Sequence, residues 1–135
     1  MNTRKGFTLV ELLVVIAILA ILATVSVVGY TSFINRAHES NAQTEAHQIE
    51  SAIESYTMAG NYYILNDTQL VDKDMKVYEY TEEDGVITKG DQVAADTVIT
   101  LDDDHDFYGL GTLTVNASGY LVYTTTTYTT GVVIK

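Results

Sequence analysis

Cysteine and proline are both absent from the 135 residues of this chain. Without cysteine, no disulfide bond can hold the fold together. Without proline, no helix is kinked by a ring that lacks a backbone N–H and clashes with the preceding turn. In an apolar helix near the N-terminus only Gly29 would soften the backbone, by about 1 kcal/mol relative to alanine.

Positive charge is scarce as well. Seven Lys and Arg residues stand against 18 Asp and Glu residues, and the formal net charge is −11. The basic residues that follow the N-terminal segment do not cluster: Arg36, Lys73, Lys76, Lys89 and Lys135. Because a field this negative repels a phosphate backbone, we expect no nucleic-acid binding through overall charge.

Sequence motifs of enzymes are missing too. The chain has no glycine-rich phosphate-binding loop, no nucleophile elbow and no triad motif. The histidines are His38, His47 and His105, and the first two face different sides because they stand about two and a half helical turns apart. We therefore predict a protein that is not an enzyme, with no catalytic residue, with surface histidines and without a resident cofactor.

The most informative feature that is present is an apolar run from Phe7 to Val28. As a helix, its roughly 22 residues would measure about 33 Å, against about 30 Å for the apolar core of a bilayer. Arg4 and Lys5 precede the run, and an acidic sequence follows it. This asymmetry predicts one membrane-spanning helix with the N-terminus in the cytoplasm and the bulk of the chain outside.

A single charge, Glu11, interrupts the run in its first turns. A carboxylate costs about 2.5–3.5 kcal/mol at the centre of a spanning helix and less near an end. Glu11 therefore needs a partner, and the rest of the run is too apolar to supply one. We expect that partner on another chain.

The segment KGFTLVEL at residues 5–12 resembles the N-terminus of the type IV pilin family, which includes the pseudopilins of type II secretion. The resemblance implies that a prepilin peptidase cuts between Gly6 and Phe7 and methylates the new N-terminal amine of Phe7. It also implies a leader peptide of six residues, 1–6. The motif covers about thirty residues and says nothing about the remainder.

The same resemblance assigns assembly to Glu11, which would pair with the Phe7 amine of a neighbouring subunit in a filament core. It implies further partners: membrane lipid before assembly, an inner-membrane assembly platform, and other pilins in a homo- or hetero-oligomeric filament. The head would lie outside the cell membrane, and later in an extracellular pilus or cell-envelope filament. Two features depart from many pilins: the chain has no cysteine pair near its C-terminus and no proline in the apolar helix.

Two plainer interpretations of the N-terminal segment remain open. A secretory signal has an apolar core of about 7–15 residues and an A-x-A-like cleavage site. This run is longer, and Ala17, Ala20 and Ala23 are spaced by three inside it. A simple single-pass anchor fits the length, but it has no use for Glu11.

The pattern predicts an α+β fold in which one long helix, from Phe7 to about Met58, packs on a small antiparallel sheet, the lollipop of the pilin family. As a continuous helix it would measure about 78 Å. Apolar positions at spacings of three and four mark its amphipathic part, which a stretch around Gly60 would cap. The expected parts are a leader at 1–6, a membrane or filament-core helix at 7–29, an amphipathic continuation at 30–60 and a β-rich head at 61–135.

Within the head we expect an antiparallel sheet of about four strands, one face of which packs on the helix. Residues 62–65 could form a strand or a short helix. The other segments with strand patterns are 76–80 and 86–88 around an Asp-Gly turn, 98–101, 112–115 and 120–123 in a hairpin, and the threonine-rich end, 124–134. Tyr120, Tyr123 and Tyr128 would pack half-buried faces of these strands, and Thr124–Thr127 would form an exposed or edge strand.

The densest charge cluster of the head contains Asp102, Asp104 and Asp106, whose alternation matches the start of a calcium-binding loop. The match ends there, because the sixth position is Phe107 and the twelfth is Leu113 instead of glycine and glutamate. A solvated acidic loop is the favoured interpretation, with calcium as the alternative and no other metal expected.

Three classes of function follow. The first is a structural subunit of a type IV pilus or pilus-like filament that polymerises through its N-terminal helix. The second is a pseudopilin of a type II secretion system. The third is a membrane-anchored binding domain that never polymerises. The head sequence reveals no ligand.

Overall fold

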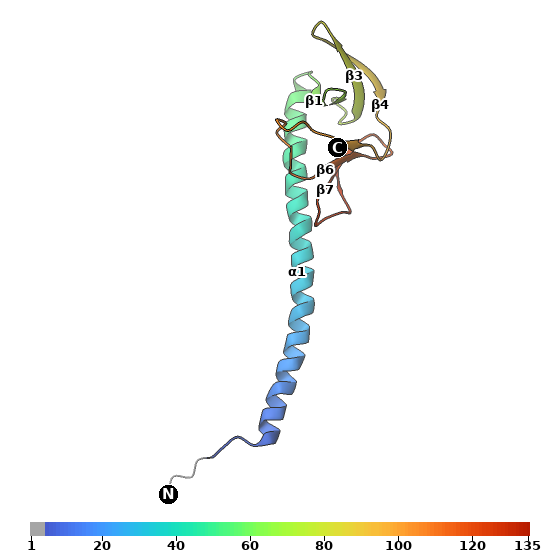
Figure 1. Cartoon of the computed structure of the whole chain (residues 1–135). Helices are drawn as coiled ribbons and strands as arrows, with labels where there is room; N and C mark the ends of the chain where they lie inside the picture. Colours follow the sequence, from blue (N-terminus) through green and yellow to red (C-terminus); the bar gives the residue numbers. More distant parts are fainter. Residues whose placement is uncertain (1–4) are drawn as a thin grey trace. The chain divides into compact units, whose positions relative to one another are not determined.

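The computed structural model describes residues 5–135 and resolves the chain into two compact units, Met1–Ala37 and His38–Lys135 (Figure 1). We call them the helical unit and the globular unit. One helix, α1 (Leu9–Met58), continues through both without a break at Gly29. The first four residues of the expected leader, Arg4 among them, lie outside the described residues.

The predicted long helix is confirmed, and its last residue is Met58 as expected. It begins at Leu9 instead of Phe7, because Thr8 occupies the N-cap position. At the other end Gly60 adopts a φ of 83°, and its N–H donates to the carbonyl of Thr57 at 3.0 Å. A left-handed glycine of this kind is a common helix terminator, so the predicted C-terminal cap is confirmed.

In the globular unit, one face of α1 carries the buried side chains, and these are Ala42, Ala46, Ile49, Ile53 and Thr57. They follow one another at spacings of three and four, so they form one apolar stripe. Tyr56, the residue before Thr57, lies off this stripe and is 57% exposed.

The strands form two antiparallel sheets of four strands each, in the orders β1-β2-β3-β4 and β5-β6-β7-β8. The first sheet consists of β1 (Tyr63–Asn66), β2 (Gln69–Val71), β3 (Val77–Glu83) and β4 (Val86–Gln92). The second consists of β5 (Val98–Ile99), β6 (Thr112–Val115), β7 (Leu121–Thr124) and β8 (Val132–Ile134). The backbones of Lys76 and Tyr120 form an isolated antiparallel β-bridge, which links the two sheets.

Both hairpins that the sequence predicted are present. Between β3 and β4, Asp84 and Gly85 have φ angles of 51° and 78°, as a two-residue turn of mirror type requires. Between β6 and β7, the side chain of Asn116 accepts hydrogen bonds from the N–H groups of Ser118 and Tyr120 at 2.9 and 3.0 Å. Local turn chemistry therefore sets the register of both pairs.

The expectation of about four strands in one sheet was wrong. The sequence did not predict β2 as a strand. Of the two alternatives left open for residues 62–65, the strand is confirmed, and β1 covers Tyr63–Asn66. The sheet divides because β3 pairs with β2 and β4, whereas β7 pairs with β6 and β8. That division depends on contacts between residues distant in the sequence, which no local pattern specifies.

The predicted strand over the threonine-rich end, 124–134, was also wrong, since within it only Thr124, the last residue of β7, and Val132–Ile134 are paired. Thr124 ends β7, so Thr124–Thr127 is not an edge strand, and Tyr128 lies in a loop. There the N–H of Tyr128 donates to the hydroxyl of Thr125 at 2.9 Å, and the N–H of Thr125 donates to the carbonyl of Tyr128 at 3.0 Å. These local hydrogen bonds replace the strand pairing that threonine propensity favours.

A single core joins α1 to both sheets in the globular unit, where Ile49 and Ile53 pack among buried side chains such as Leu65, Val77 and Leu121. In Figure 1 the strands lie beside the C-terminal part of α1. The predicted α+β class, with the helix packed on antiparallel strands, is confirmed.

One charged side chain is buried beside this core. Asp72 is 3% exposed, and its carboxylate accepts hydrogen bonds from the N–H groups of Asp74 and Lys76 and from Nζ of Lys89 at 3.1 Å. The bond to Asp72 raises the pKa of the Lys89 amine. Because a buried carboxylate is tolerated when it is paired and hydrogen-bonded, this cluster fixes the β2–β3 connection against β4.

Candidate functional site

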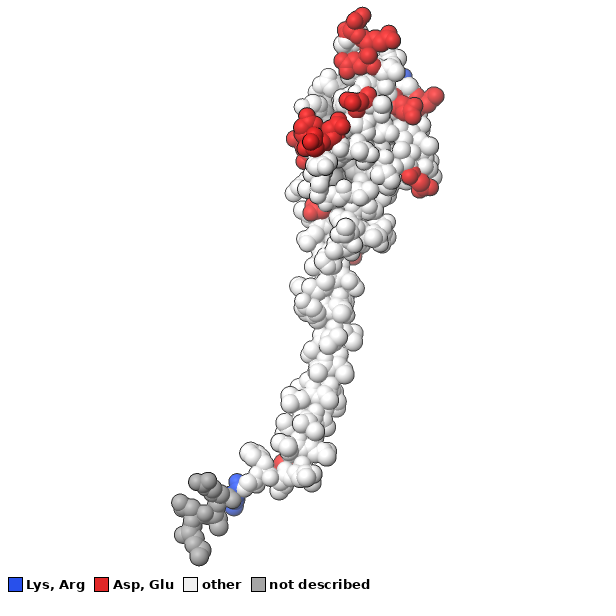
Figure 2. Space-filling model, viewed as in Figure 1, with Lys and Arg blue, Asp and Glu red and all other residues white. Residues whose placement is uncertain are grey.

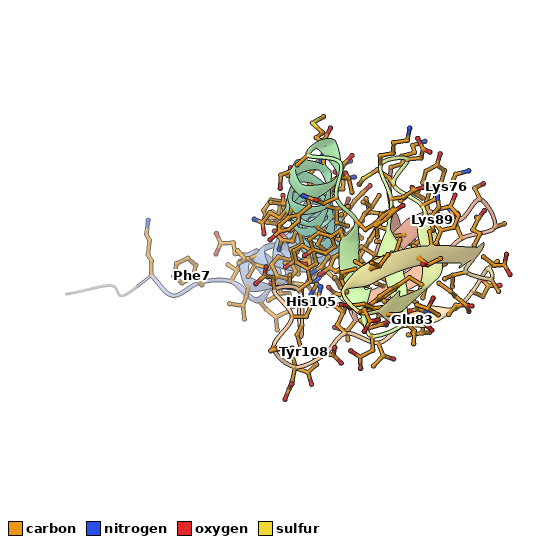
Figure 3. All side chains as sticks on the ribbon, turned by 90° about the horizontal axis from the view of Figure 1, so that it is seen from above. Phe7, Lys76, Glu83, Lys89, His105 and Tyr108 are labelled. Carbon is orange, nitrogen blue, oxygen red and sulfur yellow. The ribbon has the colours of Figure 1, made fainter. Side chains whose placement is uncertain are left out.

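The predicted processing residues lie in a short irregular segment before α1. Residues 5–8 are all exposed and belong to no helix or strand. The side chain of Phe7 is 92% exposed and projects from the ribbon in Figure 3. The peptide bond between Gly6 and Phe7 is therefore accessible to another molecule.

The fold itself does not require glycine at position 6. A Cβ atom built there would meet no other atom within 4 Å, and the backbone of Gly6 does not have the left-handed φ that favours glycine. A side chain would therefore fit without strain. A requirement for glycine at this position would have to come from a molecule that binds the segment.

Thr8 and Glu11 form a capping box at the start of α1. The N–H of Glu11 donates to the hydroxyl of Thr8 at 3.3 Å, and the N–H of Thr8 donates to the carboxylate of Glu11 at 2.8 Å. This reciprocal pair satisfies two backbone donors that a helix N-terminus otherwise leaves free. The negative charge also lies at the positive end of the helix dipole.

The sequence predicts a partner for Glu11 on another chain, and the structure adds one within the same chain. The T-x-x-E spacing of Thr8 and Glu11 is the signature of a capping box and could have been recognised. A neutral N–H does not neutralise the carboxylate, and within residues 5–135 Glu11 takes part in no ion pair. Its charge thus remains available to a cation.

The side chains of the apolar part of α1 are exposed. Within the described residues α1 contains the one segment long and apolar enough to cross a membrane, with a mean hydropathy of 3.0 and no residue buried. Even the least exposed of its large apolar side chains, Val14, is 48% exposed. Such a surface must be covered by lipid or by other apolar helices.

Three hydroxyl side chains in and beside the apolar segment are satisfied within the helix. Thr24 donates to the carbonyl of Ile21 at 2.7 Å, Ser26 donates to that of Leu22 at 2.7 Å, and Thr31 likewise bonds one turn back. In a medium without water these bonds remove the cost of the free hydroxyl donors. The polar residues of the segment are thus compatible with an apolar environment.

The candidate residues of the head are not drawn together into a metal centre. Among the described residues, 5–135, no group of three or more His, Asp and Glu side chains could hold a metal ion. Asp102, Asp104 and Asp106 lie in the exposed loop between β5 and β6, and calcium binding there stays a prediction. Figure 2 shows carboxylates gathered at several places on one face of the globular unit.

Two histidines make local contacts. His47 is exposed and its Nδ1 lies 2.8 Å from a carboxylate oxygen of Glu50, one turn further along α1. His105 lies between two elements, because its Nδ1 accepts from the N–H of Phe107 at 3.2 Å and its Nε2 lies 3.3 Å from the carbonyl of Ile64 in β1. This second contact holds the acidic loop against the first sheet, and nothing in the sequence indicated it.

Comparison with known proteins gives one match, and it falls on the N-terminal site. The family model described as the prokaryotic N-terminal methylation motif matches residues 1–27. The chain therefore carries the prepilin motif of type IV pilins and pseudopilins, and the resemblance noted in the sequence is confirmed. The proteins that this motif marks are structural.

No curated protein and no solved structure matches the chain significantly. The motif and the long apolar helix together fit a membrane-anchored precursor of the pilin type that a prepilin peptidase processes.

Proposed function

We propose that the chain is a structural subunit of a type IV pilus or pilus-like filament. It is inserted in the cell membrane through the apolar part of α1, with the globular unit outside. A prepilin peptidase cuts between Gly6 and Phe7 and methylates the Phe7 amine. The processed helix then leaves the lipid and packs against the helices of other subunits.

The observation that carries this proposal is a prepilin motif placed directly before an apolar helix whose side chains are unburied. A simple anchor explains the helix but leaves the motif unexplained. An accessible bond between Gly6 and Phe7, with no structural need for glycine there, suits a peptidase substrate. Cutting at this bond leaves Thr8 and Glu11, and with them the capping box, on the mature chain.

Glu11 has a defined part in the proposed assembly. A cut after Gly6 creates a positive amine at Phe7, and within residues 5–135 the Glu11 carboxylate has no cation. In a dry filament core the two charges favour an arrangement in which each carboxylate meets the amine of a neighbouring subunit. Subunits displaced along the filament axis from this arrangement would leave both charges unpaired, at a cost of several kcal/mol.

The test is the intact mass of the protein purified from its native cells. We expect the mass of residues 7–135 plus one methyl group. A mass that still includes residues 1–6 would overturn the proposal and leave a membrane-anchored binding domain. A cut beyond Val28 would identify the apolar segment as a secretory signal.

A second experiment separates the two kinds of filament. Antibodies against the globular unit should label long surface filaments sheared from the cells if the chain is a pilin. Processed protein that stays in the cell envelope, in cells whose secretion depends on it, would identify a type II secretion pseudopilin instead. The motif alone is common to both.

A further inference from the structure

We propose that a groove between the end of α1, β1 and the acidic loop of the globular unit binds a quaternary ammonium group. The groove has a volume of about 340 Å³, and its walls come from Tyr56, Tyr62, Tyr63, Ile64, Asp104, His105 and Asp106. It lies within the globular unit, far along the sequence from the prepilin motif, so it is independent of the proposed filament function.

Aromatic rings at steep angles to one another form the walls. The rings of Tyr56 and Tyr63 lie 5.5 Å apart at 86°, and those of Tyr63 and His105 lie 5.8 Å apart at 75°. Phe107 stacks on Tyr63 at 5.8 Å and fixes the orientation of that central ring. Edge-to-face pairs of this kind pack the rings against one another, so a cation in the groove would meet the exposed parts of Tyr56 and Tyr62 while Tyr63 supports them from below.

Much of this aromatic surface is uncovered. Tyr56 is 57% exposed, and Tyr62 and Ile64 are each 36% exposed, whereas Tyr63 is buried. The partly exposed rings of Tyr56 and Tyr62 thus lie beside the buried ring of Tyr63. Figure 3 shows His105 close to α1, with Tyr108 of the same loop further out.

Two carboxylates give the groove a negative charge. Asp104 and Asp106 line it, and no lysine or arginine does. Burial, followed by the charge of Asp106, raises the pKa of the Tyr63 phenol to about 12, so this phenol is neutral at ordinary pH. A cation gains from both the carboxylates and the ring faces, whereas an anion is repelled.

The chemistry of the walls selects the kind of cation. Calcium needs six to eight oxygen ligands, and the side chains that line the groove include two carboxylates. A primary ammonium is strongly hydrated and needs several hydrogen-bond acceptors in place of water. A quaternary ammonium makes no N–H hydrogen bonds and exchanges its water for aromatic faces, which fits apolar walls with charge at one side.

The experiment is a titration of the full-length protein in a non-ionic detergent with choline, followed by the NMR signals of the tyrosine rings. We expect saturable shifts with a Kd of about 1 mM, since exposed cation–π contacts are weak individually. The neutral carbon isostere of choline, in which carbon replaces nitrogen, has the same shape without the charge. It should bind at least about fivefold more weakly.

Two pairs of variants locate the site. Tyr56→Leu keeps an apolar side chain but removes a ring, and it should weaken choline binding by about two- to fivefold. Tyr108→Leu is its control, because Tyr108 is 58% exposed in the same loop as His105 but does not line the groove. Asp106→Asn should weaken binding by about threefold, whereas Asp103→Asn, the same change outside the groove, should not.

Three results would overturn the proposal. The first is equal binding of choline and its neutral isostere, which would reduce the groove to an apolar surface. The second is shifts caused by calcium chloride but not by choline chloride. The third is tighter binding of a lysine amide than of choline, which would assign the groove to hydrated cations. Circular dichroism of each variant checks that a loss of binding is not a loss of folding.

Discussion

Glu11 contributes to the molecule in two ways, as part of a helix cap and as a charge, and single substitutions can separate them. Glutamine at the same position can still accept the hydrogen bond from the Thr8 N–H, because either Glu or Gln completes a capping box. It cannot neutralise an amine. Alanine removes both contributions.

We expect Glu11→Gln to leave the precursor folded and membrane-inserted while lowering the yield of sheared filaments by at least about tenfold, because the partner amine is left unpaired in a dry core. Glu11→Ala should reduce assembly or methylation at least as strongly while the globular unit stays folded. The measurement is filament yield per cell against total protein. Wild-type yields from either variant would refute the role given to this carboxylate, and Thr8→Ala, which weakens only the cap, is the control.

Tyr123 and Glu45 link β7 to α1 inside the globular unit. The buried phenol donates to the Glu45 carboxylate at 2.5 Å, and burial together with this bond raises the pKa of the phenol far above its usual value. The donor is therefore protonated at all physiological pH values. This pair is not recognisable in the sequence, because the two residues are 78 positions apart.

Tyr123→Phe removes only the hydroxyl and leaves the carboxylate without this donor. We expect the free energy of unfolding of the globular unit to fall by about 1–3 kcal/mol, as for a hydrogen bond to a charged group. Urea unfolding followed by circular dichroism measures it. Tyr120→Phe in the same hairpin is the matched control, since within residues 5–135 the Tyr120 hydroxyl has no hydrogen-bond partner; equal losses from both variants would show that the bond contributes nothing.

At the scale of elements, the β3–β4 hairpin depends on its two-residue turn. β4 is a largely exposed edge strand, so little side-chain burial supports it. A Cβ on Gly85 would meet no atom within 4 Å, which leaves the positive φ of 78° as the only objection to a side chain there. The hairpin is therefore a place where backbone conformation can be tested without steric interference.

Gly85→Ala should destabilise this hairpin by about 1–2 kcal/mol, because an L-residue in the left-handed region bears that cost. Hydrogen exchange of the β3 and β4 amides should accelerate while exchange in β6 and β7 stays unchanged. Asp84→Asn, which keeps a residue tolerant of positive φ, should leave exchange in β3 and β4 as it is. A uniform acceleration in both sheets would instead show that the turn controls global stability.

The sequence predicted those elements whose signals are local. The apolar run, the spacing of Ile49 and Ile53, the Asp84-Gly85 turn and the turn at Asn116 each specify a structure within a few residues, and all are present. Prediction from the sequence failed for the features that depend on contacts between distant residues. β2 is three residues long and becomes a strand only by pairing with β1 and β3, and the groove beside Tyr56 needs a loop fifty residues further on.

At the scale of the whole molecule, the chain combines two units with opposite solubility. Every buried apolar side chain of the described residues lies between Ala42 and Ile134, whereas the large apolar side chains from Phe7 to Val28 are all exposed. The core of the globular unit thus draws nothing from the helical unit. The proposed cleavage and assembly would therefore change the surroundings of the helical unit without unfolding the globular unit.

We therefore expect residues 38–135, produced alone, to be a soluble monomer that unfolds cooperatively with heat. Size-exclusion chromatography and thermal circular dichroism measure both properties. The first turn of the shortened helix will fray, because His38 supplies no N-cap side chain of the preferred kind. Aggregation, or unfolding without a cooperative transition, would show that the apolar half contributes to the fold of the globular unit.

The hydroxyls of Thr24, Ser26 and Thr31 donate to carbonyls of their own helix, so they offer no free hydrogen-bond donor to a neighbouring helix. For two such helices in contact, sliding or rotation exchanges one dispersion contact for another of similar energy. If apolar contacts alone determined the packing, many axial offsets and rotations of one helix relative to the other would have nearly the same energy. The carboxylate of Glu11 in the first turns of α1 is then enough to make one axial offset the most favourable, because its charge distinguishes that offset from the others.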